Sequence, residues 1–330
     1  NMKTHKAIAL FSGGLDSILA VKWMQSKGYA VHPVFFKAPY LLPERAINYA
    51  AKNAIDLEVI DVSEEHIKLL DNPVYGFGKG LNPCIDCHGF MFKKAAELMP
   101  DRDADYLISG EVLGQRPKSQ KRNALNNVSK LSGVKDLIVR PLSQNLLPDT
   151  LPLREGWIAK KDMLSIQGRG RLAQLALAEE LGIVDFPSPA GGCLLTDRNY
   201  CLRLQDLKKH QQDDLHSINL LAYGRHFRLT EEVKLIIGRD EAENETLKNI
   251  FREGLMLQAQ DYMGPLGFIT GKLNFATLDL ALAIFILYHP KVPKSANIEV
   301  WRISNNKIIA NPPNLNLYTV SSASAQIYNS

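Results

Sequence analysis

The chain has 330 residues, of which 45% are hydrophobic and 22% are charged, so its composition is that of an ordinary globular protein. Lysine and arginine number 39 against 35 for aspartate and glutamate, and the resulting net charge of +4 excludes a histone-like polycation. The length predicts about two domains, each large enough for its own hydrophobic core without a disulfide or metal scaffold.

No segment has the features of a signal peptide or a membrane span. The apolar run 7–11 is too short for a signal peptide, and the longest apolar helix pattern, 278–288, is shorter than the roughly 18–20 residues of a span. The four cysteines suit a compartment in which disulfides are rare. We therefore expect a cytoplasmic protein with no membrane partner.

The first part of the chain alternates short apolar strands with helices. The expected strands are 7–11, 30–36, 57–62 and 106–110, and the expected helices are 16–27, 43–53 and 171–181. Pro33 suggests an edge or irregular strand, because proline cannot donate a ladder hydrogen bond. The alternation predicts an α/β fold, a doubly wound and mostly parallel sheet.

The pattern changes after the Pro- and Gly-rich break at 187–192. Beyond it we expect helices over 201–214, 241–251 and 275–288 and strands over 233–237 and 297–303, which together predict a second, smaller α/β domain. The expected organisation is a first domain over 1–195, a connecting segment over 196–230 and a second domain over 231–330.

A glycine-rich hexapeptide joins the first expected strand to the first expected helix: Ser12-Gly13-Gly14-Leu15-Asp16-Ser17. Two glycines allow the backbone to approach a ligand, and a helix N-terminus presents free N–H groups to a phosphate. Asp16 suits a Mg²⁺ ion that neutralises the phosphates. The alternative is a tight turn in which Asp16 and Ser17 only cap the helix.

This hexapeptide resembles the signature of the PP-loop ATP pyrophosphatases. The resemblance implies an adenine-nucleotide α-hydrolase-like fold and ATP bound by residues 12–17. It also implies a reaction in which ATP is split between its α and β phosphates, a substrate oxygen is adenylated, and a nucleophile displaces AMP. The loop is not a Walker A motif, since no Gly-Lys-Ser or Gly-Lys-Thr follows.

A second stretch, 109–120, is similar to a motif of the tRNA 4-thiouridine synthetases of the ThiI family, and so is Arg140-Pro141-Leu142. The resemblance implies that Gly110 and Gln115 line the nucleotide site and that Arg140 lies near the activated centre. The alternative is a loop of two turns with a solvated Glu111 and an exposed Arg116.

Three cysteines form the second candidate centre. Cys84 and Cys87 form a Cys-x-x-Cys pair, and Cys193 follows two glycines far along the chain. Three thiolates suit a [4Fe–4S] cluster with one open iron, the interpretation we favour, as in several sulfur-inserting PP-loop enzymes. Persulfide chemistry on Cys193 or Cys87, or structural zinc with Cys201 or His88 as fourth ligand, stays open. Otherwise Cys201 is expected to be an ordinary semi-buried thiol.

The last third of the chain resembles the NFACT RNA-binding domain at Ile237-Gly238-Arg239-Asp240, at 243–247 and in the helix 280–288. ThiI proteins carry an N-terminal THUMP domain that grips tRNA. We expect none here, because the first strand begins beside Met2, and this departure puts the mode of tRNA binding and the modified position in doubt. The alternative is a generic α/β domain that buttresses the first.

Together these features predict an ATP-dependent tRNA sulfurtransferase that makes a thiouridine, with 4-thiouridine favoured. The expected catalytic residues are Asp16, Cys84, Cys87, Cys193 and Arg140. Asp16 would hold Mg²⁺, and the three cysteines would hold the cluster. Expected partners are tRNA and a sulfur donor, either sulfide or a cysteine desulfurase, with a homodimer left open. Alternatives are a zinc-containing synthetase acting on a small molecule and a non-catalytic RNA-binding protein. Basic residues supporting an anionic partner are Lys118, Lys121, Arg122, Lys130, Lys160, Lys161, Arg169 and Arg171.

Overall fold

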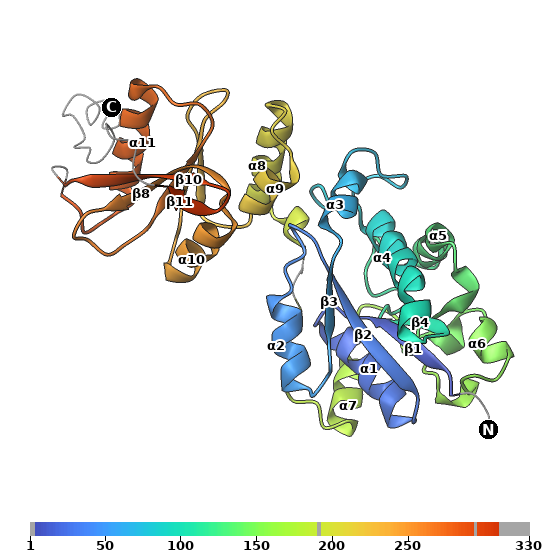
Figure 1. The fold of residues 1–330 in the computed structure, drawn as a ribbon. Helices are drawn as coiled ribbons and strands as arrows, with labels where there is room; N and C mark the ends of the chain where they lie inside the picture. Colours follow the sequence, from blue (N-terminus) through green and yellow to red (C-terminus); the bar gives the residue numbers. More distant parts are fainter. Residues whose placement is uncertain (1–3, 190–192, 294–295, 310–330) are drawn as a thin grey trace. The chain divides into compact units, whose positions relative to one another are not determined.

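The computed structural model describes residues 4–189, 193–293 and 296–309. The chain divides into two compact units, Asn1–Arg198 and Asn199–Ser330, each with its own sheet (Figure 1). Each unit is considered by itself below.

The first unit is built on a five-stranded parallel sheet with the order β3-β2-β1-β4-β5. Its strands are β1 (Lys6–Leu10), β2 (Ala30–Lys37), β3 (Glu58–Asp61), β4 (Tyr106–Ser109) and β5 (Ile138–Val139). The predicted doubly wound α/β fold is confirmed. β5 was not predicted, because a strand of two residues carries no periodic signal.

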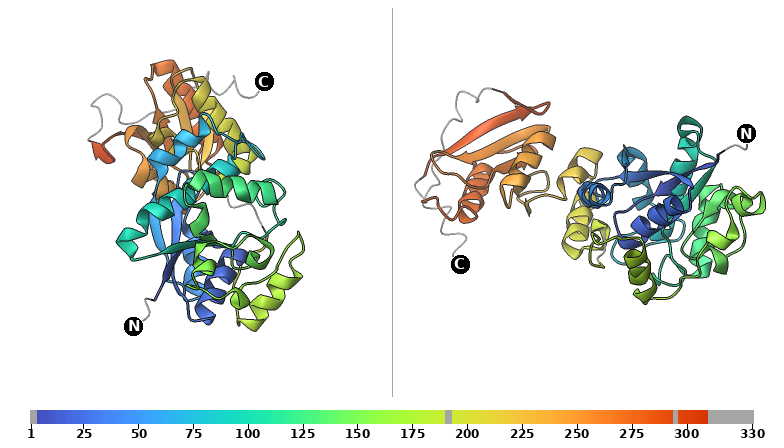
Figure 2. Two further views of the ribbon diagram at one scale, coloured as in Figure 1. Left: turned by 90° about the vertical axis from the view of Figure 1, so that its right-hand side faces the viewer. Right: turned by 90° about the horizontal axis from the view of Figure 1, so that it is seen from below.

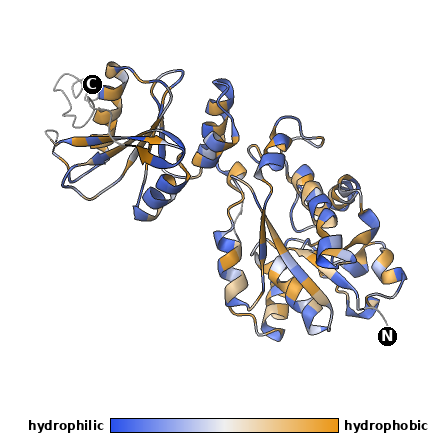
Figure 3. Ribbon diagram, viewed as in Figure 1, coloured by the Kyte–Doolittle hydropathy of each residue, from blue (hydrophilic) through white to orange (hydrophobic). Residues whose placement is uncertain are grey.

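Helices cover both faces of this sheet (Figures 1 and 2). Ala7 and Ala9 of β1 face a core shared with α1 (Leu15–Ser26), α2 (Glu44–Lys52) and α7 (Leu172–Glu180). Ile8 faces the opposite core, with α4 (Cys84–Leu98) and α5 (Arg122–Ser132). Short helices α3 (Ser63–His66) and α6 (Leu151–Arg154) complete the unit. Hydrophobic and hydrophilic residues alternate along α2 and α4, as expected for helices with one buried face (Figure 3).

The expectation of an edge strand at 30–36 is wrong for the strand as a whole, since β2 lies between β1 and β3. Pro33 pairs with Ala9 of β1, whereas the pairing with β3 begins only at Val34. Pro33 therefore lies where β2 has a neighbour on one side only, which is a local edge that tolerates a residue without an N–H.

The second unit is built on a six-stranded antiparallel sheet with the order β11-β10-β8-β9-β7-β6. The strands are β6 (Arg225–Arg228), β7 (Lys234–Ile237), β8 (Glu253–Ala259), β9 (Gly267–Thr270), β10 (Ile298–Ser304) and β11 (Lys307–Ile309). The helices are α8 (Arg198–Lys209), α9 (Leu215–Leu220), α10 (Glu241–Ile250) and α11 (Phe275–Leu287). Among the described helices, none is long and apolar enough to cross a membrane.

Two cores flank this sheet. Leu257 of β8 and Ile269 of β9 share a core with Phe285 of α11, while Phe268 of β9 faces the other core with Leu247 of α10. Ile269 and Phe268 are neighbours in β9, so their side chains point to opposite faces, as the period of two requires.

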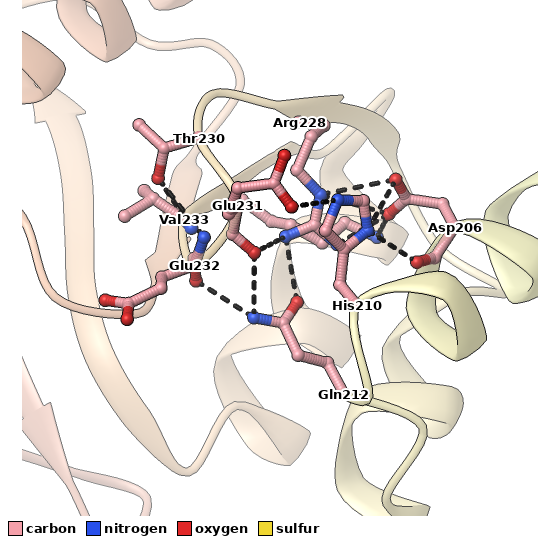
Figure 4. Close-up of polar contacts among 9 residues, drawn as sticks. Asp206, His210, Gln212, Arg228, Thr230, Glu231, Glu232 and Val233 are labelled. Atoms are coloured by element: carbon pink, nitrogen blue, oxygen red, sulfur yellow. Dashed lines mark hydrogen bonds and ion pairs between the residues drawn. The ribbon is translucent and has the colours of Figure 1, made fainter.

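The segment 196–230, expected to connect the domains, contributes α8, α9 and β6 to the second unit. Arg228 of β6 donates to the Asp206 carboxylate of α8 at 2.6 Å and to Gln212 Oε1 at 2.8 Å (Figure 4). This partly buried network ties α8 to the β6–β7 turn within the second unit.

Candidate nucleotide and cysteine site

The glycine-rich hexapeptide forms the turn between β1 and α1. Gly14 is the N-cap of α1, and no side chain caps the helix, so the N–H groups of the first turn stay open toward a ligand. Ser17 Oγ donates to the Gly14 carbonyl at 2.8 Å, and Ser12 Oγ lies 3.3 Å from Ser17 Oγ. The helix N-terminus, the glycine backbone and two hydroxyl groups therefore surround one small region.

Two glycines allow three segments to meet at this turn. Gly13 has φ +77°, and a Cβ there would lie 2.7 Å from the Cα of Ala46 in α2. A Cβ at Gly110 would lie 2.5 Å from the carbonyl oxygen of Asp16. Such contacts are too short for any side chain, so glycine at these positions lets α2 and the segment after β4 pack directly against the loop.

The loop lies at the switch point of the sheet. The chain runs outward from β1 in both directions, since β2 and β3 lie on one side and β4 and β5 on the other. The carboxyl ends of β1 and β4 carry residues 12–17 and 110–115, respectively. Open α/β sheets bind ligands in the crevice outside such a point. The topology thus explains why two motifs about 100 residues apart come together.

Asp16 begins a chain of polar contacts. Gln115 Nε2 donates to Asp16 Oδ2 at 2.8 Å, and Gln174 Nε2 of α7 donates to Gln115 Oε1 at 2.6 Å. Burial raises the pKa of Asp16, and the charges of Arg171 and Arg116 act in the opposite direction. Asp16 Oδ1 is buried and has no hydrogen-bond partner among the described residues. An unused buried carboxylate oxygen is a ligand that Mg²⁺ accepts.

Cationic side chains surround the loop. Arg116 and Arg171 act on Asp16, and the Nε atoms of Arg171 and Arg45 are buried without a hydrogen-bond partner in the described ranges. Gly168 N donates to Leu113 O at 2.8 Å, which holds the basic run 168–171 beside the second motif. Arg45 precedes Ala46, the residue that packs on Gly13, and no sequence motif had singled it out.

Glu111 is the centre of a buried ion-pair network. Arg140 Nε donates to Glu111 Oε2 at 2.7 Å, His88 Nδ1 lies 2.9 Å from Oε1, and Ser109 Oγ donates to Oε2 at 3.0 Å. Burial by itself would raise the pKa of Glu111, but Arg140 and His88 outweigh it and lower the pKa to about 2. The alternative of a solvated Glu111 is wrong, because its exposed fraction is 5%.

Arg140, expected near the activated centre, is itself buried and directed onto Glu111. Its guanidinium also donates to Ser129 Oγ at 3.2 Å, and its backbone N–H donates to Gln144 Oε1 at 2.8 Å. These contacts hold the segment after β5 against the segment after β4. Arg140 thus positions the second motif.

The Cys-x-x-Cys pair opens α4, a helix that the sequence analysis did not predict. The Asp86 carboxylate accepts hydrogen bonds from Val74 N at 2.7 Å and Tyr75 N at 3.0 Å, which orders the loop before the helix. A helix N-terminus lowers the pKa of a thiol. Burial outweighs that effect at Cys84, whose pKa is raised although Arg116 lowers it.

Two backbone hydrogen bonds hold the segment that begins at Cys193 near the Cys-x-x-Cys pair. Leu194 N donates to the Tyr40 carbonyl at 3.1 Å, and Leu81 N donates to the Leu195 carbonyl at 3.0 Å. Burial, then the charges of Cys193 and Cys84, raise the pKa of Cys87 well above its ordinary value. The three cysteines therefore lie within electrostatic range of one another. The glycines 191 and 192 before Cys193 lie outside the described residues.

The cysteines do not form a ready ligand set. Within the described ranges, no group of three or more His, Cys, Asp or Glu side chains is arranged to hold a metal ion, and the four cysteines form no disulfide. Cys201 lies buried on α8 in the second unit.

A buried histidine contacts the Cys-x-x-Cys pair. The Tyr40 hydroxyl lies 2.6 Å from His66 Nδ1, and His66 Nε2 lies 3.1 Å from Cys87 Sγ. Burial lowers the pKa of His66 to about 4, so its imidazole is neutral at pH 7. The sequence analysis missed this contact, because Tyr40, His66 and Cys87 have no motif spacing and meet only through the sheet.

Comparison with known proteins agrees with both resemblances. Residues 3–145 match the family model described as thiamine biosynthesis protein (ThiI), and residues 224–313 match the model described as the NFACT protein RNA-binding domain. No curated protein sequence is similar enough to count as a match.

Solved structures are similar at low identity. The predicted subunit of a tRNA methyltransferase from Methanocaldococcus jannaschii is 17% identical, with TM-score 0.31, over 41% of this chain and 68% of that chain. A 4-thiouridine synthetase, in a complex with RNA and bound ATP, is 20% identical, with TM-score 0.33, over 54% of this chain and 52% of that chain. NMN synthetase from Francisella tularensis is 11% identical, with TM-score 0.29, over 58% of this chain and 91% of that chain.

The chain spans about half the length of that 4-thiouridine synthetase. The two family models cover separate parts of the chain, one in each compact unit. The resemblance inferred from the phosphate-type loop, the second motif and the C-terminal pattern is therefore confirmed. Residues 3–145 of the chain are thus similar to the ThiI family, and residues 224–313 are similar to the NFACT protein RNA-binding domain.

Proposed function

We propose that the protein is a cytoplasmic, ATP-dependent tRNA sulfurtransferase that converts a uridine of tRNA to a thiouridine, with position 4 of the base as the reacting carbon. ATP binds at residues 12–17, Gly110 and Gln115, and Asp16 holds the Mg²⁺ that neutralises the phosphates. Cys84, Cys87 and Cys193 form the region from which sulfur is delivered. The sulfur comes from sulfide or from a cysteine desulfurase.

The reaction has two balanced steps. The C4 oxygen of uridine attacks the α-phosphorus of ATP, the bond to pyrophosphate breaks, and the N3 proton leaves. Hydrosulfide then attacks C4, the C4–O bond breaks with AMP as the leaving group, and the hydrosulfide proton moves to N3. With hydrosulfide as the donor, one oxygen is exchanged for one sulfur with no external oxidant or reductant. Persulfide sulfur from a cysteine desulfurase needs two electrons, which a second thiol supplies by forming a disulfide with the carrier cysteine. Catalysis rests on positioning and on neutralisation of phosphate charge.

The observation that carries the proposal is the position of Arg116. Its charge lowers the pKa of Asp16 in the nucleotide loop and also that of Cys84 at the start of α4. One exposed guanidinium therefore lies within electrostatic range of both candidate centres. An activated uridine bound between them would meet both the nucleotide and the sulfur.

We keep a [4Fe–4S] cluster on Cys84, Cys87 and Cys193 within the proposal, but derive no step through it because the cysteines are not arranged as a ligand set. Anaerobic purification with iron and acid-labile sulfide assays tests it. About four irons and four sulfides per chain support the cluster. Zinc alone supports the structural alternative, and a metal-free active protein supports a persulfide on Cys193 or Cys87.

The function is tested by ATP–pyrophosphate exchange with and without bulk tRNA, followed by mass spectrometry of nucleosides from treated tRNA. Exchange that requires tRNA, together with one new thiolated nucleoside, supports the proposal. Exchange with a small molecule and without tRNA would identify a synthetase instead. Absence of exchange with every tRNA would leave an RNA-binding protein without catalysis.

Substitution of Cys193 by serine is expected to abolish thiolation, with at least a 100-fold loss, while tRNA-dependent pyrophosphate exchange persists. Adenylation needs the nucleotide loop, whereas sulfur delivery needs the thiol. The control is Cys201→Ser on α8 in the second unit, which should retain both activities. Normal thiolation by Cys193→Ser would remove this cysteine from the proposal.

Gln174→Leu is expected to lower kcat/KM for ATP about 10-fold, because Gln115 loses its partner and no longer holds the Asp16 carboxylate in one orientation. The exposed Gln167 provides a control in Gln167→Leu, which should leave the kinetics unchanged. Steady-state pyrophosphate exchange measures both. Unchanged kinetics in Gln174→Leu, with a normal circular dichroism spectrum, would separate α7 from nucleotide binding.

A further inference from the structure

The second unit contains a cavity of about 330 Å³ beside the end of α11. Six of its lining residues carry the argument: Arg225, Arg239, Met263, Tyr288, His289 and Lys291. The cavity lies at the lower end of the range of small-ligand pockets, about 300–1,000 Å³. All six residues fall within the matched RNA-binding region, 224–313.

Positive charge dominates the lining, which contains three cationic side chains and no carboxylate among the described residues. Arg239 is paired with Glu243 of α10, so its charge is partly neutralised. The Arg225 guanidinium lies 5.3 Å from the centre of the Tyr288 ring, and Lys291 is exposed. Arg225 and Lys291 are thus available to an anionic group.

His289 is a buried residue of the cavity wall. Its exposed fraction is 2%, and neither ring nitrogen has a hydrogen-bond partner among the described residues. A Cβ at Gly264 would lie 2.3 Å from His289 Nε2, so glycine is needed to let the ring pack against the backbone. Burial lowers the pKa of His289, which favours a neutral ring with one donor and one acceptor.

A buried polar ring without a partner is unfavourable unless a ligand completes its hydrogen bonds. The same wall carries an aromatic platform. Tyr288 is 41% exposed, and Phe227 supports it from within the unit at a ring-centroid distance of 5.2 Å. Met263 is 90% exposed at the mouth. The cavity therefore offers an aromatic side chain and two available cations, and its wall holds a buried histidine ring whose nitrogens have no partner among the described residues.

We propose that this cavity binds one unpaired nucleotide of an RNA strand. Its base stacks on Tyr288 and bonds the ring of His289, and its phosphates contact Arg225 and Lys291. Aromatic side chains stack with bases that are splayed out of a helix, while the bases of a duplex are already stacked on one another. The inference rests on the proposed function only in that it takes RNA as the partner.

The test measures binding of the full chain to a fluorescein-labelled single-stranded RNA 12-mer by anisotropy. Tyr288→Ala should weaken binding about 10-fold, since one stacked base is lost. Tyr288→Phe keeps the ring and should bind as the unsubstituted chain does. The control is Phe275→Ala, an aromatic that is 75% exposed at the opposite end of α11, which should also bind normally.

Two further variants test the other contacts. Lys291→Gln should reduce the salt dependence of log K by about 0.7, the value of one phosphate contact on a single strand, while Lys272→Gln should leave it unchanged. Gly264→Ala should weaken binding about as much as Tyr288→Ala, because the added methyl group would lie 2.3 Å from His289 Nε2 and the ring would have to leave its position in the cavity wall. Thermal melting of each variant confirms that it folds.

The outcomes separate this inference from the proposed function. If the chain binds the 12-mer and the Tyr288→Ala, Lys291→Gln and Gly264→Ala variants bind it equally well, the cavity is not the site, and the sulfurtransferase proposal is unaffected. Equal binding of the same 12-mer annealed to its complement overturns the unpaired-nucleotide assignment. Full competition by uridine monophosphate at the same concentration overturns the RNA strand as the ligand, because a free nucleotide would then suffice. If no RNA binds, the RNA partner of the proposed function fails as well.

Discussion

Asp16→Asn is expected to reduce tRNA-dependent ATP–pyrophosphate exchange by at least about 100-fold. Asparagine keeps the size of the side chain and can still contact Gln115, but it removes the negative charge that the Mg²⁺ requires. The buried Oδ1, which has no partner among the described residues, would no longer be a strong ligand. Initial-rate exchange across a Mg²⁺ titration measures the effect.

Asp136 provides the matched control for this experiment. It is an exposed aspartate of the first unit, paired with Arg154 at 2.6 Å, and such surface pairs contribute about 0–1 kcal/mol to stability. Asp136→Asn should therefore keep normal exchange. If Asp16→Asn retains full activity at low Mg²⁺, the hexapeptide is only a tight turn and the nucleotide site lies elsewhere.

Glu111→Gln is expected to lower the free energy of unfolding at pH 7 by about 3–5 kcal/mol, because the variant leaves the Arg140 guanidinium buried without its counter-ion. Urea denaturation measures the loss. Glu58 is the control: Arg102 is the main cause that lowers its pKa to about 2 as well, but the pair is partly exposed. Glu58→Gln should change stability by about 1 kcal/mol or less.

The pH dependence of Glu111 has a defined sign. The pKa of Glu111 is about 2 in the folded chain against 4.5 ordinarily, so its contribution is complete above about pH 4.5 and decreases as the pH falls toward 2. Glu111→Gln should lose less stability over that interval than the unsubstituted chain does. An unchanged acid dependence in the variant would contradict the ion pair.

Combining Glu111→Leu with Arg140→Met should recover part of the stability that Glu111→Gln loses, because an apolar pair leaves no charge buried.

The two experiments also distinguish the roles of two expected site residues. Asp16 has an unused oxygen that faces the nucleotide loop, whereas the Arg140 guanidinium is occupied by Glu111 and Ser129. Loss of Asp16 should therefore impair the reaction at normal stability. Loss of Arg140 should impair the reaction through the stability and placement of the second motif.

Several features of the candidate site were predictable from sequence because they are local. A glycine pair between an apolar strand and a helix already specifies a turn with open N–H groups, and residues 12–14 form that turn directly before the first residues of α1. The alternation of strands and helices over the first part of the chain likewise predicted the parallel sheet. Each of these signals lies within a few neighbouring residues or within one repeating pattern.

Other features depend on contacts between distant segments, which no spacing reveals. His66 contacts Cys87 and Tyr40 only because β2, β3 and α4 are neighbours in the folded unit, and Gln174 reaches Gln115 across 59 positions of sequence. Pro33 is tolerated because β3 begins its pairing one residue later, a matter of register. Periodicity describes one element at a time and carries no information about its neighbours.

The structure gives positions to the cysteines and charged side chains that the sequence only counts. By itself, the sequence determined the fold class, the phosphate-type loop and the resemblance of the C-terminal region to an RNA-binding domain, since each is encoded in consecutive residues. Only the tertiary structure decided that Glu111 is buried with Arg140, that Cys87 lies buried near Cys84 and Cys193 with a raised pKa, and that His289 lines a cationic cavity. Burial and the position of opposite charges control protonation and ligand binding, and both are properties of the packed chain.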